Sequence, residues 1–257
     1  MSETAKTAHR CRFVIVTQPR SGSYHLASML DSAPDTTCLG EILKRDRIEL
    51  PPDLAARAGI DRADVDGRDA DIAAYLARLL AACETPVFGF KEFRSRIAQS
   101  GIGPLTLRSR HWQKIFLYRN PIRKYISLQR AHDTGSFTKR RDDVRPQDNV
   151  IIRFDPAGFE GVLRNDRRMR DLCQRLRAAQ PGAVSEVDYR DLGDPARIGQ
   201  VLRFIRSEAD PAALYSSYYR QNTLSLEESV EDFDVLSRHM RENGHEALLE
   251  DALLAGT

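Results

Sequence analysis

The chain has 257 residues, 41% of them hydrophobic and 30% charged, with a formal net charge of +2. This composition is typical of a folded globular domain and excludes a strongly basic nucleic-acid-binding protein, while the length allows a full hydrophobic core. Its apolar runs all fall short of the roughly 20 residues that a membrane-spanning helix needs, so we expect one soluble domain over residues 1–257 without a membrane span.

The N-terminal segment, residues 1–11, is polar and lacks the apolar core of a signal peptide. We expect it to form a flexible tail. The four cysteines are widely spaced and form no CxxC pair, which favours reduced, buried thiols over a disulfide framework. Together these features predict a cytoplasmic protein.

Five short runs rich in β-branched and aromatic residues predict strands, and the segments between them have helical periodicity. The alternation favours parallel βαβ units, so the expected fold is α/β, with a central parallel β-sheet flanked by helices. From Pro195 onward the pattern predicts a helical C-terminal region. The predicted strands cover residues 13–17, 87–90, 114–118, 150–154 and 183–187, and the predicted helices cover residues 23–31, 70–82, 122–131 and 159–179.

Two polar segments have no clear period. Residues 44–68 are charged and contain two prolines and two glycines, and their structure stays unassigned. Residues 133–149 are also polar and aperiodic, and long loops of this kind often cover substrates. We expect a mobile loop there that acts as a flap over a substrate, with an ordinary disordered surface loop as the alternative.

The first motif is RFVIVTQPRSGSYHL, residues 12–26, which predicts a strand, a turn and a helix. Such a junction directs free backbone N–H groups and the positive end of the helix dipole at one point, which suits a phosphate or sulfate. Gly22 allows close approach of the anion, Ser21 and Ser23 offer hydroxyls, and Arg20 adds a forked cation. A helix-capping turn without a ligand is the alternative. The motif lacks the glycine–lysine pair of nucleoside triphosphatases and their magnesium-binding hydroxyl, which favours sulfuryl over phosphoryl transfer.

The second motif is KIFLYRNPIRKYISLQRA, residues 114–131, another strand followed by a helix. Arg119 stands at the carboxyl end of the strand, where open α/β sheets bind ligands. On the helix, Arg123 and Ser127 share one face because they are four positions apart. The alternative is a solvated amphipathic helix.

Together the motifs resemble those of sulfotransferases that use 3′-phosphoadenosine 5′-phosphosulfate (PAPS), and the resemblance covers nearly the whole chain. It implies a P-loop-like sulfotransferase fold, with PAPS as co-substrate, adenosine 3′,5′-bisphosphate (PAP) as product and no metal. In that family the first motif holds the 5′-phosphosulfate, while the arginine and serine of the second hold the 3′-phosphate. The resemblance rests on residues 20–23, 117–121 and 127, and on segments 40–43, 88–91, 187–192 and 220–222. The implied nucleotide-binding residues are Arg20, Ser21, Gly22, Ser23, Tyr24, Arg119, Ser127, Arg220, Gln221 and Asn222.

Departures from the family pattern narrow the resemblance. Arg20 replaces the lysine of the cytosolic phenol and steroid branch, which favours the bacterial and carbohydrate branch. Tyr24 and His25 stand where relatives have other residues, so the lip of the site is unusual. The histidine base of the cytosolic branch has no counterpart here, and the six histidines and four cysteines show no metal-ligand spacing.

The candidate catalytic residues are therefore drawn from several segments. Glu41 is the first candidate for the general base, because a bacterial sulfotransferase that the chain resembles uses a glutamate in this region; a helix N-terminal carboxylate is the alternative. His25 is the second candidate base. Lys91 is expected to contact the transferring sulfuryl oxygens or the acceptor, or else to be a paired surface lysine. Arg20 is expected to stabilise the charge that develops on the leaving group.

The sequence thus predicts transfer of a sulfuryl group from PAPS to a hydroxyl of a polar acceptor. The low aromatic content of 7% favours a carbohydrate or glycosylated metabolite as the small-molecule partner, and we expect no nucleic-acid partner. The sequence does not decide between a monomer and a homo-oligomer. The alternatives are a nucleotide or sugar kinase of related fold and a non-enzymatic polyanion-binding protein that uses the basic helix of the second motif.

Overall fold

A five-stranded sheet forms the centre of the protein, for which we have a computed structural model that describes residues 9–135, 150–218 and 224–254. All its strand pairs are parallel, in the order β2–β3–β1–β4–β5. The parallel α/β fold is therefore confirmed. The strands are β1 (Cys11–Thr17), β2 (Thr36–Glu41), β3 (Val87–Phe93), β4 (Trp112–Tyr118) and β5 (Val184–Asp188).

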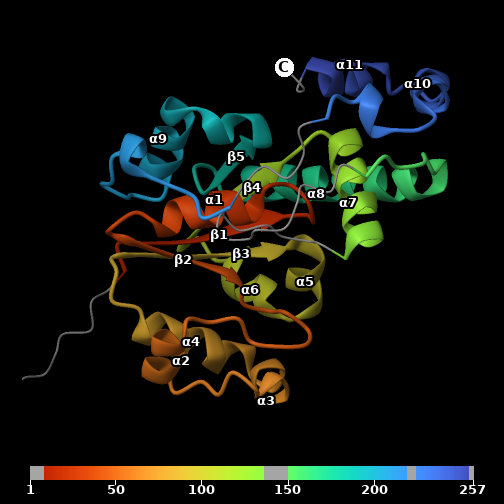
Figure 1. The fold of residues 1–257 in the computed structure, drawn as a ribbon. Helices are drawn as coiled ribbons and strands as arrows, with labels where there is room; N and C mark the ends of the chain where they lie inside the picture. Colours follow the sequence, from red (N-terminus) through yellow and green to blue (C-terminus); the bar gives the residue numbers. More distant parts are fainter. Residues whose placement is uncertain (1–8, 136–149, 219–223, 255–257) are drawn as a thin grey trace, which may run out of the picture.

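Helices cover both faces of the sheet (Figure 1). Alternate residues of β1 explain why: Phe13 and Ile15 join the hydrophobic cluster under α1 and α9, whereas Val14 and Val16 join the cluster on the opposite face. The helices are α1 (Ser23–Asp31), α2 (Pro52–Ala58), α3 (Val65–Ala70), α4 (Ile72–Ala82), α5 (Arg94–Gln99), α6 (Ile102–Thr106), α7 (Pro121–Thr134), α8 (Pro156–Ala179), α9 (Pro195–Phe204), α10 (Phe233–Glu242) and α11 (Glu246–Leu254).

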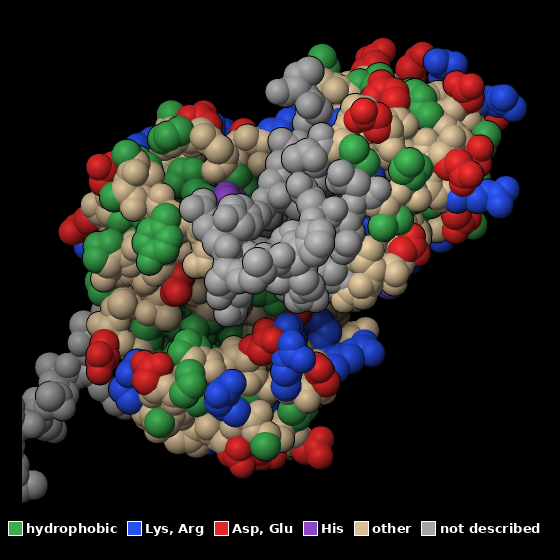
Figure 2. Space-filling view, in the orientation of Figure 1, with side chains coloured by type: hydrophobic (Ala, Val, Ile, Leu, Met, Phe, Trp, Pro, Cys, Tyr) green, Lys and Arg blue, Asp and Glu red, His purple; other side chains and the backbone are tan. Residues whose placement is uncertain are grey.

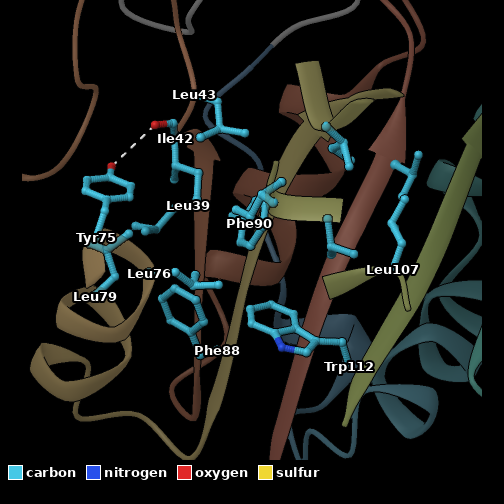
Figure 3. Close-up of a cluster of buried hydrophobic side chains, with 14 of the residues drawn as sticks. Leu39, Ile42, Leu43, Tyr75, Leu76, Leu79, Phe88, Phe90, Leu107 and Trp112 are labelled. Carbon is cyan, nitrogen blue, oxygen red and sulfur yellow. Dashed lines mark hydrogen bonds between the residues drawn. The ribbon is translucent and has the colours of Figure 1, made fainter. Parts of the chain in front are cut away.

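The core cluster opposite α1 is built largely from aromatic and leucine side chains of β2, β3, β4 and α4 (Figure 3). Trp112 meets Phe90 edge to face, with 5.6 Å between ring centroids. At the edge of the cluster the Tyr75 hydroxyl donates to the Ile42 carbonyl over 3.3 Å. This bond fixes the chain just after Glu41, at the end of β2.

Several local predictions were wrong. The strand expected at 150–154 is absent from the sheet: Ile152 forms only an isolated bridge with Val230, because its side chain packs in a separate cluster with α7 and α8. Strand β2 was not predicted, and the unassigned segment 44–68 contains α2 and the start of α3. The expected tail 1–11 is too long, since Cys11 begins β1 and the ring of His9 bonds to two backbone carbonyls.

The expected loop 133–149 begins too early, because α7 continues to Thr134 and only Gly135 of the following residues is described before residue 150. The helix itself matches the prediction over 122–131. In the described ranges 9–135, 150–218 and 224–254, no helix has both the length and the apolar character needed to cross a membrane.

Strand order places the candidate site. From β1 the chain crosses to β2 on one side, and from β4 it proceeds to β5 on the other side. The carboxyl ends of β1 and β4, which are adjacent, therefore form the topological switch point where open α/β sheets bind ligands. The two motifs singled out in the sequence both follow these two strands.

Candidate active site

The turn after β1, residues 18–22, contains two left-handed residues, Arg20 with φ 67° and Gly22 with φ 80°. A β-carbon at Gly22 would lie 2.4 Å from Cδ2 of Tyr189, far inside van der Waals contact. Glycine is thus required here for both its dihedral angle and its small size. The turn leads directly into α1, which begins at Ser23.

Polar groups in this turn suit an anion. Helix α1 has no side-chain N-cap bond and no acidic residue in its first turn, so its dipole and terminal N–H groups face the turn uncompensated by a carboxylate. The hydroxyl of Ser21 is buried and has no hydrogen-bond partner among the described residues. An unsatisfied buried hydroxyl is costly, and an anion oxygen at the turn would satisfy it.

The second motif contributes its cation to the same turn. Arg119, just after β4, donates from Nη1 to the carbonyl of Arg20 over 2.9 Å and lies 4.4 Å from the ring centroid of Tyr189. Arg20 in turn donates from Nε to Oγ of Ser127 on α7 over 2.9 Å. Burial lowers the pKa of Arg20, an effect that Tyr189 opposes. The structure therefore brings Arg20, Arg119 and Ser127 together, as a phosphate-binding group requires.

The rest of α7 is a structural support and not a basic surface. Its start is fixed by Pro121 and by the Asn120 side chain, which accepts from the Ile122 N–H over 2.9 Å. The cationic side chains of Arg123 and Lys124 are buried, at 7% and 3% exposure. The reading of α7 as a solvated amphipathic helix is therefore wrong. Acidic and basic side chains are also interspersed on the face drawn in Figure 2.

Glu41 and Lys91 lie together at the ends of β2 and β3. They are partners in the parallel register, after an irregularity between Leu39 and Glu41, and Nζ of Lys91 donates to Oε1 of Glu41. Lys91 is fully buried, with its Nζ 3.9 Å from the ring centroid of Tyr24 and 4.3 Å from that of Phe93. Glu41 is thus a strand-end carboxylate, and its reading as a helix N-terminal residue is wrong. Lys91 is paired but is not on the surface.

Tyr24 connects this ion pair to the anion-binding turn, because it is the second residue of α1. Its ring packs on Nζ of Lys91, and burial together with the nearby carboxylate of Glu41 raises the pKa of its hydroxyl. Burial also lowers the pKa of Lys91, an effect that Glu41 opposes. The arrangement places a carboxylate, a cation and a phenol immediately beside the turn. His25, the next residue of α1, is half-buried.

Three residues of the site were given no role by the sequence analysis. Tyr189 supports both Gly22 and Arg119, and its position directly after β5, on the binding edge of the sheet, is the signal that identifies it. Phe93 and Tyr218 pack on Lys91 and Tyr24 respectively, and only tertiary structure reveals them. The predicted residues Arg220, Gln221 and Asn222 lie outside the described residues. No group of three metal-ligating side chains occurs in the part of the chain that the structure describes.

A turn suited to an anion lies at the switch point of a parallel sheet, and the neighbouring strand adds a second cation. This arrangement is that of a P-loop-like fold. No protein-family model matches the chain. Nodulation protein H of Rhizobium tropici is 26% identical over 232 residues, which cover 88% of each chain.

Similar solved structures include the sulfotransferase domain from the curacin biosynthetic pathway, with a TM-score of 0.51, 14% identity and coverage of 94% of this chain and 89% of that one. Another is the sulfotransferase domain from the Synechococcus PCC 7002 olefin synthase, with a TM-score of 0.47, 16% identity and coverage of 82% and 78%. The fold is that of the sulfotransferases, and the resemblance to this family indicated by the motifs is confirmed.

Proposed function

We propose that this protein is a sulfotransferase that moves a sulfuryl group from PAPS to a hydroxyl group of a polar acceptor, a carbohydrate or glycosylated metabolite. The observation that carries the donor assignment is the meeting of Arg20, Arg119 and Ser127 at one turn. A donor with phosphate groups at both the 5′ and the 3′ positions needs two anion-binding groups, and the turn and the second motif supply them side by side.

The fit of the turn to such a donor supports the proposal. The buried hydroxyl of Ser21 has no hydrogen-bond partner among the described residues and would donate to an oxygen of the bound donor. Any larger side chain at Gly22 would fill the space beside the turn, where Tyr189 lies. PAPS, when bound, supplies the sulfuryl group and a phosphate leaving group. Arg20 and the backbone N–H groups at the start of α1 would hold the negative charge that develops on the 5′-phosphate, a kind of stabilisation worth about 10²- to 10³-fold for each such donor.

In the proposed reaction the acceptor hydroxyl oxygen bonds to sulfur while the bond between sulfur and the 5′-phosphate oxygen breaks, and that oxygen keeps the electron pair. The acceptor proton passes to Glu41. Lys91 holds this carboxylate in place through its ion pair, and Tyr24 packs on Lys91. Lys91 would also offer its cation to the sulfuryl oxygens. A base fixed in this way contributes about 10²- to 10⁴-fold to turnover.

Calorimetry of the free protein tests the donor. PAP should bind much more tightly than adenosine 5′-monophosphate, because only PAP carries the phosphate that Arg119 and Ser127 would contact. Arg119→Ala should weaken PAP binding by about 2–5 kcal/mol if the contact is well desolvated, with little effect on the monophosphate. The exposed Arg175→Ala on α8 is the matched control. Equal affinities for the two nucleotides, or tighter binding of ATP with magnesium, would refute the donor assignment and favour a kinase.

The acceptor can be identified directly. Incubation with ³⁵S-labelled PAPS and fractionated host extract should label a polar, sugar-containing fraction, whereas labelling of a phenol or steroid would contradict the proposed acceptor class. We place the reaction in the cytoplasm, a proposal supported by the four cysteines, all of which are free and buried.

A further inference from the structure

A second group of basic residues lies at the opposite edge of the sheet. Residues 9–12 lead into β1 and residues 110–111 precede β4. Since these strands are parallel neighbours with Arg12 opposite Trp112, the two basic segments lie side by side. They surround a hollow of about 290 Å³. Its lining residues are His9, Arg10, Cys11, Arg12, Arg110, His111, Gln113 and Arg206.

The charges around this hollow do not cancel. Arg10 is paired with Asp35, with 2.6 Å between Nη2 and Oδ2, and with Glu208. Arg12, Arg110 and Arg206 form no ion pair with any described residue. Arg206 follows the C-terminal end of α9, whose dipole offsets only about half a charge. Several positive charges therefore share one concave surface without compensation.

Two buried polar atoms at the hollow also lack partners. Nε of Arg10 and Oε1 of Gln113 are shielded from solvent and form no hydrogen bond within the described residues. Buried polar atoms in folded proteins are nearly always satisfied. A bound group with both acceptor oxygens and a hydroxyl, such as a phosphate monoester, would satisfy both.

We propose that this hollow, defined by Arg10, Arg12, Arg110, His111, Gln113 and Arg206, binds a small phosphorylated or sulfated molecule with at least two anionic groups. Guanidinium forks match the oxygens of such groups in pairs, and the concave shape suits a small molecule. The hollow is not the donor site, because the seven residues of β1 separate the two edges by about 20 Å. The inference does not depend on the proposed transfer reaction.

Isothermal titration with pyrophosphate tests the proposal. All proteins carry Arg119→Ala together with Arg20→Ala, which weakens anion binding at the turn after β1. In this background we compare the double variant Arg110→Gln/Arg206→Gln with a control double variant at two exposed arginines that do not line the hollow, Arg175→Gln/Arg238→Gln. Both pairs remove the same net charge.

We expect the Arg110/Arg206 pair to weaken pyrophosphate binding by about tenfold or more, and the control pair to change it by less than about twofold. Binding of PAP to protein with intact Arg20 and Arg119 should be unaffected by either pair. Equal losses in both pairs would show that only net charge attracts the anion and would overturn the proposal. So would the absence of any pyrophosphate binding in the Arg20→Ala/Arg119→Ala background. Circular dichroism of each variant checks that it is folded.

Discussion

Gly22→Ala tests whether the anion-binding turn is shaped by the contact with Tyr189. At φ 80° an alanine costs about 1–2 kcal/mol in backbone strain alone. The added β-carbon would lie 2.4 Å from the Tyr189 ring, and overpacking of this kind costs typically about 1–3 kcal/mol more. The expected loss in unfolding free energy is therefore the sum, about 2–5 kcal/mol.

A matched control separates the two contributions. Gly182 has φ 81°, and a β-carbon there would meet nothing within 4 Å. Gly182→Ala should therefore cost only the backbone part, about 1–2 kcal/mol. In a Tyr189→Ala background most of the steric part at Gly22 should disappear, since only the contact of 3.3 Å with Leu192 remains. The two substitutions should therefore show a coupling energy of about 1–3 kcal/mol.

Urea denaturation of the four variants measures these differences in unfolding free energy, and calorimetry measures how tightly each variant binds PAP. Because Tyr189 also stacks on Arg119, Gly22→Ala should weaken PAP binding even if the fold adapts. If Gly22→Ala is no more destabilising than Gly182→Ala, and PAP binds normally, then the turn relaxes freely and the argument for a rigid cradle is wrong.

Two further predictions concern the neighbouring charges. Glu41→Gln should lower turnover about 10²- to 10⁴-fold and leave PAP affinity nearly unchanged. If Glu41→Gln keeps its turnover and His25→Ala loses it, then His25 is the base. Burial raises the pKa of Glu92 from 4.5 to about 7. The folded protein therefore keeps a proton that the unfolded chain releases, so this group's contribution to stability is complete below pH 4.5 and is lost as the pH rises through 7, by up to about 3 kcal/mol. Urea unfolding across this range should show the decline, and Glu92→Gln should flatten it; an unchanged slope in the variant would assign the decline to other groups.

The turn after β1 and its neighbour Arg119 could be located from the sequence because each depends on a local pattern. A strand with a continuous apolar run, a glycine and a helix suffice to define the turn, and Arg119 is found by the same strand–helix pattern. The predicted helix at 23–31 coincides with α1 for this reason. Strand β2, TTCLGE, carries too short an apolar run and a glycine, so its propensity is weak, and only pairing with β3 makes it a strand.

The opposite error at residues 150–154 has the same origin. Ile152 has high β-propensity, but tertiary contacts hold it in a cluster with α7 and α8 and leave it only two backbone bonds to the segment around Val230. The pairing of Glu41 with Lys91 lies equally beyond local pattern, because the residues are 50 positions apart and an irregularity in β2 sets their register.

Buried charges give an independent reason to place chemistry at this edge. A buried ion pair costs several kcal/mol in lost hydration for each ion, and apolar residues of similar volume are often at least as stable. Yet two such pairs flank the turn after β1. Just beyond its end, Tyr24 packs on Lys91, which is paired with Glu41. At its start, Gln18 accepts a hydrogen bond from Lys124, which is paired with Asp166. Stability alone gives no reason for two buried ion pairs to hold the two ends of one short turn. Binding of an anion would give such a reason: a rigid turn holds its charged and hydrogen-bonding groups in place and need not reorganise as charge develops on that anion.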